Sequence, residues 1–164
     1  MPVTEIIKEY RISPLRIFWH RRRVLNYLKA RMADIKPIPG VILMLKALKA
    51  AGIKMFILTS NSKENVNAFL KNNQIEVFDG VYARRDLFGK AAGIKKILQE
   101  WKLTEKEAVF YVGDETRDIE AAKKAGIGAI AVSWGYSEAT LLKKFTPDIV
   151  VSKPEEMLKF ARET

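Results

Sequence analysis

The stretch AVFYVGDETRDIEAAKKAG, residues 108–126, decides the fold of this chain. Its first five residues are apolar, aromatic or β-branched, which predicts a short buried strand. Gly113 ends that strand, and the segment that begins at Thr116 predicts a helix that stops at Gly126. A buried strand followed at once by a helix is a unit of an α/β fold, and such folds bind ligands where their strands end.

Two aspartates of this stretch are candidate site residues. Asp114 follows the strand and Asp118 lies in the first turn of the helix, so both are expected beside the same crevice. Carboxylate oxygens in that position suit Mg²⁺, which prefers carboxylates, water and substrate phosphate. The alternative is structural, because Asp114 could be a turn residue and Asp118 could complement the helix dipole. The stretch alone leaves both interpretations open.

The alternation of strands and helices continues along the chain. It predicts an α/β fold with a doubly wound, mostly parallel sheet, because strands separated by helices are joined by crossover connections. Further helices are predicted at 40–53, 62–73, 91–102, 137–145 and 154–162, and further strands at 54–59, 78–84, 128–134 and 148–151. Residues 1–36 are predicted to be helical, and prolines at positions 37 and 39 separate them from the α/β core of residues 37–164.

Composition excludes several kinds of site. The chain has 164 residues with no cysteine and one histidine, so we expect no disulfide framework, thiolate or multi-histidine metal site, or Ser/His/Asp triad. At 48% hydrophobic residues it can build one domain with a core. It shows neither a signal peptide nor an apolar stretch long enough to span a bilayer, so the expected location is cytoplasmic, without a membrane partner.

Positive charge is concentrated near the amino terminus. The formal net charge is +10, and residues 1–40 carry nine Lys/Arg against three Asp/Glu. The densest segment is HRRRVLNYLKAR, residues 20–31. It could contact nucleic acid or an acidic partner. No known nucleic-acid motif accompanies it, which favours a solvated helix face whose long side chains cover apolar residues.

Two more loops carry candidate residues. Ser60 and Asn61 follow the predicted strand 54–59, where a hydroxyl and free backbone N–H groups form an anion site, or an ordinary helix cap. Lys90 follows Gly89 at a predicted helix start, although cations are unfavourable at that end of the helix dipole. The position makes sense if the ammonium group neutralises a bound phosphate and nearby carboxylates. Otherwise Lys90 is a solvated surface lysine.

These residues, in this order, resemble a known family. Ser60, Lys90 and the GDETRD loop are similar to motifs II, III and IV of the haloacid-dehalogenase-like hydrolases. The likeness covers residues 37–164 and is closest to the phosphoglycolate-phosphatase-like branch, whose core is Rossmann-like. Residues 1–36 resemble the tail of the helical cap that this branch inserts after its first strand. Each motif alone is weak, but the ordered set on this topology is specific.

The resemblance implies a role for each candidate residue. Ser60, assisted by the Asn61 backbone, would bind the transferring phosphoryl group, and Lys90 would bridge the phosphate and the nucleophile. Asp114 would ligate Mg²⁺, and Asp118 would support the metal site or Lys90. The implied function is Mg²⁺-dependent hydrolysis of a small phosphorylated metabolite, in which positioning and charge neutralisation supply most of the catalysis.

One motif of the family is missing. Its nucleophile is an aspartate of an Asp-x-Asp motif at the end of the first core strand, ahead of the cap. This chain has six aspartates, at positions 34, 79, 86, 114, 118 and 148, and no two are separated by one residue. The chain could be a fragment, half of a split enzyme, or a non-catalytic binding module that uses its basic segment. The retention of all four motif residues, Ser60, Lys90, Asp114 and Asp118, favours the fragment, which by itself would turn over little or nothing.

The missing strand has a structural consequence. In the family it is the central strand, between the strands predicted here at 54–59 and 108–112. Its absence would leave facing edges about 10 Å apart, with unpaired backbone groups. The edges would have to pair directly, accept a segment of another chain, or partly unfold and associate. We therefore expect the isolated chain to be oligomeric or marginally stable, with self-association through exposed strand edges.

Overall fold

The computed structural model describes residues 23, 35–83, 89–105 and 108–160, and most of the segment predicted as a partial cap, residues 1–36, lies outside them. The described elements alternate as predicted, which confirms the α/β class. In chain order they are α3 (Val41–Ala50), β1 (Phe56–Thr59), α4 (Lys63–Asn72), β2 (Gly80–Ala83), α5 (Lys90–Glu100), β3 (Phe110–Gly113), α6 (Thr116–Ala125), β4 (Gly128–Val132), α7 (Ala139–Lys144), β5 (Ile149–Val151) and the 3₁₀ helix η2 (Pro154–Lys159).

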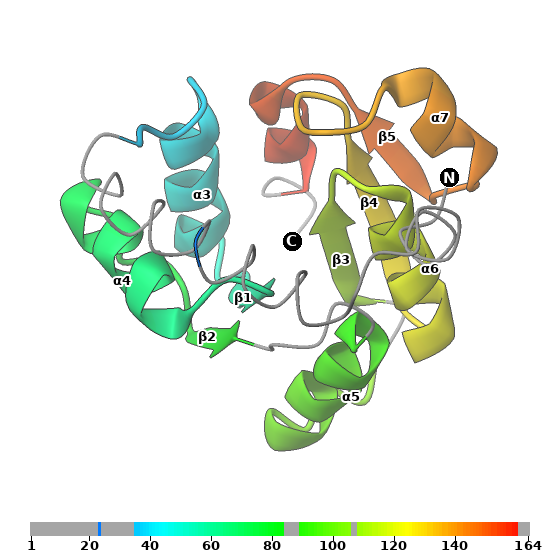
Figure 1. Ribbon diagram of the computed structural model, residues 1–164, viewed down its shortest axis with the longest axis horizontal. Coiled ribbons are helices and arrows are strands. Elements are labelled where there is room, and N and C mark those ends of the chain that lie inside the picture. Colours follow the sequence, from blue (N-terminus) through cyan, green and yellow to red (C-terminus); the bar gives the residue numbers. More distant parts are fainter. Residues whose placement is uncertain (1–22, 24–34, 84–88, 106–107, 161–164) are drawn as a thin grey trace.

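The strands form two separate parallel sheets (Figure 1). β1 pairs with β2, with Phe56 opposite Gly80 and Thr59 opposite Ala83. β3, β4 and β5 form the second sheet in that order. The predicted mostly parallel sheet is divided between β1 and β3, each of which has a described partner on one edge only. Direct pairing of β1 with β3, one of the three outcomes considered above, is not what this structure shows.

The central strand of the three-stranded sheet, β4, is covered on both faces. Alternate residues of β4 face opposite sides. Ala129 and Ala131 pack in a cluster with α5, α6 and α7, and their small side chains let the helices approach closely. Ile130 and Val132 pack on the other side with α3 and η2. The β4 pattern GAIAV thus encodes two unlike faces, one for close helix packing and one for larger apolar side chains.

The helix α5 connects the two sheets. It packs against α6 and also contacts β1. At its carboxyl end, the ring of Trp101 lies 4.8 Å from that of Phe56 in β1, and its indole N–H donates to the Tyr82 hydroxyl of β2 at 2.9 Å. Leu58 of β1 is packed against the cluster that contains α5 and α6. The helix α5, which begins at Lys90, therefore packs against both sheets.

Helix ends follow the local sequence signals in two cases and depart in one. Ser62 caps α4 by accepting a hydrogen bond from the Asn65 backbone at 3.2 Å. Gly126 ends α6 in the left-handed conformation, with φ of 77°. The closing helix, predicted over 154–162, is a 3₁₀ helix over Pro154–Lys159. No helix among the described residues is both long and apolar enough to cross a membrane.

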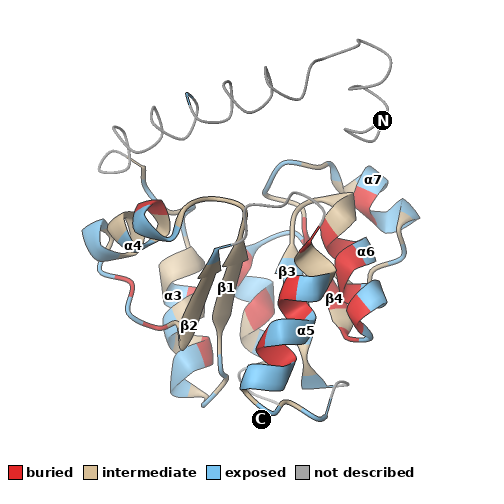
Figure 2. Cartoon of the chain, turned by 60° about the horizontal axis from the view of Figure 1, so that its bottom comes forward, coloured by how far each residue is buried: buried red, intermediate tan, exposed pale blue. Residues whose placement is uncertain are grey.

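One face of β3 is left partly uncovered (Figure 2). Phe110 is 39% exposed and Val112 is 47% exposed. Val112 lies opposite Ile130, which is 3% exposed, so the same face is covered over β4 and open over β3. Strands buried on two faces normally carry such apolar runs. The apolar pattern of β3 is therefore that of a strand covered on both faces, whereas the described residues leave one of its faces partly open.

Candidate active site

A buried ion pair joins the starts of α5 and α6. The ammonium of Lys90 donates to Oδ1 of Asp118, and the two side chains are 19% and 5% exposed. The other oxygen of Asp118 accepts the backbone N–H of Glu115 at 3.2 Å. Burial raises the pKa of Asp118 above its ordinary value, and Lys90 opposes that shift. The prediction that Lys90 neutralises a nearby carboxylate thus agrees with this geometry.

Gly113 makes room for this pair. A Cβ atom at position 113 would lie 2.4 Å from both Cβ and Oδ2 of Asp118, closer than atoms approach in proteins. The ring centroid of Tyr111, two residues earlier in β3, lies 6.0 Å from Nζ of Lys90. Burial, followed by the charge of Asp118, raises the pKa of the Tyr111 hydroxyl, so this tyrosine stays neutral. β3 therefore supplies both a gap for the carboxylate and an aromatic neighbour for the ammonium.

Asp114 comes directly after β3 and is held by the loop between β4 and α7. Its Oδ2 accepts the backbone N–H of Tyr136 at 2.7 Å, and its carbonyl accepts that of Ser137 at 3.1 Å. Within the described part of the chain, its Oδ1 has no hydrogen-bond partner. One carboxylate oxygen is therefore committed to the protein and one is available.

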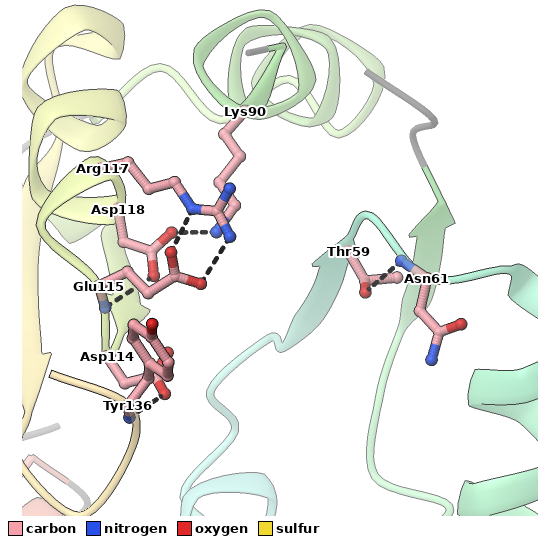
Figure 3. Close-up of polar contacts among 8 residues, drawn as sticks. All are labelled: Thr59, Asn61, Lys90, Asp114, Glu115, Arg117, Asp118 and Tyr136. Atoms are coloured by element: carbon pink, nitrogen blue, oxygen red, sulfur yellow. Dashed lines mark hydrogen bonds and ion pairs between the residues drawn. The ribbon is translucent and has the colours of Figure 1, made fainter. Parts of the chain in front are cut away.

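Sequence reasoning missed a second ion pair beside the first. The Arg117 guanidinium donates from Nη2 to Glu115 Oε1 at 2.6 Å, and its Nε contacts Oε2 of the same carboxylate. Figure 3 shows this pair next to Lys90 and Asp118. Both residues stand in the GDETRD loop, so their charge and position were the available signal. The site therefore holds two cations and three carboxylates on one side.

The predicted phosphate-binding residues lie at the end of β1, across from this cluster (Figure 3). The backbone N–H of Asn61, expected to assist in phosphate binding, donates to Thr59 Oγ1 at 3.0 Å. The Asn61 side chain accepts the Ser62 backbone N–H at 2.8 Å and the Asn65 amide at 3.1 Å. Ser62 and Asn61 thus order the start of α4, and Ser60, directly before them, is half-buried.

The structure therefore brings some predicted residues together and separates others. Lys90, Asp114 and Asp118 gather where β3 ends, in the three-stranded sheet. Ser60 and Asn61 stand where β1 ends, in the two-stranded sheet. Both groups are at carboxyl ends of parallel strands, where α/β folds bind ligands.

Comparison with known proteins decides the family. The family model described as haloacid dehalogenase-like hydrolase matches residues 1–132. The chain belongs to this family. The resemblance drawn from the motifs is thereby confirmed, and it includes Lys90 and the GDETRD loop within the matched range.

Individual relatives agree with this assignment. The chain is 32% identical to a phosphoglycolate phosphatase of Synechococcus elongatus, over 94% of this chain and 73% of that protein. It is 28% identical to a phosphoglycolate phosphatase of Aquifex aeolicus, of which it spans 63%. A haloacid dehalogenase-like hydrolase of Streptococcus pneumoniae superposes with a TM-score of 0.79 at 27% identity, covering 91% of this chain and 71% of that one.

The donor set of this haloacid dehalogenase-like chain fits Mg²⁺ in part. Among the described residues there is no cluster of three or more metal-ligating side chains. Asp114 offers one uncommitted oxygen, whereas both oxygens of Asp118 are occupied by Lys90 and the Glu115 backbone. Mg²⁺ often binds through one or two carboxylates and fills its remaining positions with water and substrate phosphate. Asp114 therefore suits a metal ligand, and Asp118 suits the partner of Lys90.

Proposed function

We propose that this chain carries the phosphate- and metal-binding part of a Mg²⁺-dependent phosphatase that hydrolyses a small phosphorylated metabolite. The observation that carries the proposal is the buried Lys90–Asp118 pair beside the free oxygen of Asp114. Membership of the hydrolase family supports the reaction class. The names of the relatives make 2-phosphoglycolate the first substrate to test.

The position of Lys90 is costly unless it serves an anion. Its ammonium stands at the amino end of a helix, where the dipole is positive, and only 19% of the side chain is exposed. Asp118 offsets part of this cost and fixes where the ammonium points. A phosphate placed next to Lys90 would supply further negative charge. Phosphoryl transfer depends on such positioning and charge neutralisation, and bound Mg²⁺ would draw further charge from the phosphoryl oxygens.

The described aspartates do not supply a nucleophile. Asp79 accepts hydrogen bonds from Lys49 and from the Met55 backbone, and Asp148 accepts one from the Ala129 backbone at 2.7 Å. Both therefore hold the amino ends of strands, away from the site. Asp118 is paired with Lys90, and Asp114 is the proposed metal ligand.

The proposed nucleophile is instead an aspartate on a further strand, not contained in this sequence, that pairs with the free edges of β1 and β3. The chain alone is then expected to turn over little.

The alternative function, a binding module for nucleic acid or an acidic partner, rests on residues 20–31. Of these only Arg23 is described, as an exposed helical residue. No observation in the described ranges favours that function. A cytoplasmic location remains part of the phosphatase proposal, because the expected substrate is a metabolite.

Phosphate binding tests the proposal without requiring turnover. We expect inorganic phosphate, added with Mg²⁺, to bind the purified chain in calorimetry, and Lys90→Met to weaken binding at least tenfold. Lys95→Met is the matched control, since Lys95 is an exposed lysine on the same helix. Equal binding by Lys90→Met and the native chain would refute the assigned site. Strong Mg²⁺-dependent hydrolysis of p-nitrophenyl phosphate by this chain would refute the external nucleophile.

A further inference from the structure

The loop between β4 and α7, residues 133–138, touches Asp114 at three points. The backbone N–H of Tyr136 donates to its Oδ2, and that of Ser137 donates to its carbonyl. Gly135 completes the contact, because a Cβ atom there would lie 2.1 Å from Oδ2 and 2.3 Å from Cβ of Asp114. Both the main chain and the carboxylate of Asp114 are thus fixed by one loop.

This contact requires glycine at position 135. No larger residue can keep the loop this close, since the new atom would overlap the carboxylate itself. Trp134 of this loop packs on the hydrophobic core, whereas Gly135 and Tyr136 are exposed and Tyr136 is 86% exposed. The contacts of Gly135 and Tyr136 therefore act on Asp114 rather than on the core.

The consequence is a carboxylate with a set orientation. One oxygen is occupied by a main-chain donor, so the other is presented alone. A cation would then meet a one-oxygen ligand that has already lost its rotational freedom. Mg²⁺ demands near-ideal octahedral geometry, and partners that orient a ligand typically change metal affinity 10- to 100-fold.

We propose that Gly135 and the backbone N–H of Tyr136 are positioning elements that hold Asp114 as a one-oxygen ligand for a divalent cation. This inference rests on the proposed function, because it takes Asp114 as the metal ligand. The side chain of Tyr136 has no part in it.

The test is a Mn²⁺ titration of the chain followed by paramagnetic broadening of backbone amide signals near Asp114, which reports weak binding without turnover. Gly135→Ala and Tyr136→Pro should each raise the Mn²⁺ concentration at half-broadening about 10- to 100-fold. Tyr136→Ala, which keeps the N–H, should match the native chain. Phosphate binding through Lys90, measured without a divalent cation, should not change in any of them.

The outcomes separate the two proposals. If the native chain and Asp114→Asn respond alike to Mn²⁺, Asp114 is not a metal ligand, and both the metal part of the proposed function and this inference fail. If the native chain binds and Gly135→Ala binds equally well, the inference alone is wrong. Circular dichroism identifies a variant that does not fold. If Gly135→Ala does not fold, the comparison of Tyr136→Pro with Tyr136→Ala tests the inference: equal Mn²⁺ binding by these two variants would refute it.

Discussion

The Lys90–Asp118 pair offers a test that separates stability from function. Asp118→Asn preserves the shape of the side chain and the acceptor for the Glu115 backbone, but leaves the ammonium of Lys90 without its counter-charge. Lys90→Met leaves the carboxylate of Asp118, 5% exposed, without its partner. Breaking a buried pair from one side typically costs 3–5 kcal/mol, and the partial exposure of Lys90 places each single change near ~3 kcal/mol.

The double variant should lose less unfolding free energy than the two single variants lose together. Lys90→Met with Asp118→Asn removes both charges, and neutral replacements of a buried pair are often tolerated. We expect the double variant to lose at least ~2 kcal/mol less than the two single changes added together. In a chain of this size each single change corresponds to a fall in melting temperature of about 6–12 °C. Phosphate binding should nevertheless be lost in the double variant, because the ammonium is gone.

The pH dependence supplies an independent check. Burial already raises the pKa of Asp118 above the ordinary 3.8, and Lys90→Met removes the group that opposes this. A carboxyl group with a raised pKa in the folded state contributes stability that is fully present below its pKa in the unfolded state. This contribution is lost as pH rises through its pKa in the folded state. The stability gap between native chain and Lys90→Met should therefore narrow toward pH 4. Urea unfolding at pH 4 and pH 7, followed by circular dichroism, measures both effects. The buried pair would be refuted if the losses of unfolding free energy in the single variants added up to that of the double variant, and if the stability difference between the native chain and Lys90→Met did not change with pH.

Three more outcomes follow from the same contacts. Gly113→Ala should displace Asp118 and lower the unfolding free energy by about 1–3 kcal/mol; an unchanged unfolding free energy in urea would contradict this. Asp79→Asn should cost about 1 kcal/mol at neutral pH. Lys49, followed by the Met55 backbone, lowers the pKa of Asp79 below 3.8. The stabilisation by Asp79 should therefore be present above pH 3.8 and disappear as pH falls through the lowered pKa. Urea unfolding curves at several pH values measure this loss. The isolated chain should self-associate in light scattering, and Val112→Lys, which charges the exposed face of β3, should reduce association; a monodisperse, cooperatively melting native monomer would exclude it.

The parts of the fold that depend on local signals could be predicted from the sequence. Gly126 ended α6 where a left-handed glycine was expected, and the alternation of strands and helices gave the class. The division into two sheets could not be read from any one strand, because β1 and β3 carry the apolar pattern of strands with two neighbours. The 3₁₀ geometry of the closing helix, which packs against α3, was not visible in the local sequence either.

The site divides in the same way. Lys90 was identified because a cation at a helix start contradicts the helix dipole, and that contradiction is visible in the sequence. The role of Tyr136 was not visible, because a backbone N–H carries no residue-type signal. Gly135 gave a weak signal, because it is a glycine after a strand, but glycines are common in turns of any kind. The two aspartates differ in their hydrogen-bond partners, because Asp118 pairs with Lys90 and Asp114 with the backbone of Tyr136. These partners come from elements far apart in sequence, so the sequence did not show the difference.

The split of the sheet and the split of the site have one origin. Ser60 and Asn61 follow β1, and Asp114 follows β3, so the two groups flank the two strand edges that no described strand pairs. A parallel strand placed there would satisfy both edges, and its carboxyl end would lie between the groups proposed to bind phosphate and metal. Under the proposed function, the segment that completes the sheet is therefore the one that supplies the nucleophile, which ties catalytic competence to the same hydrogen bonds that stabilise the core.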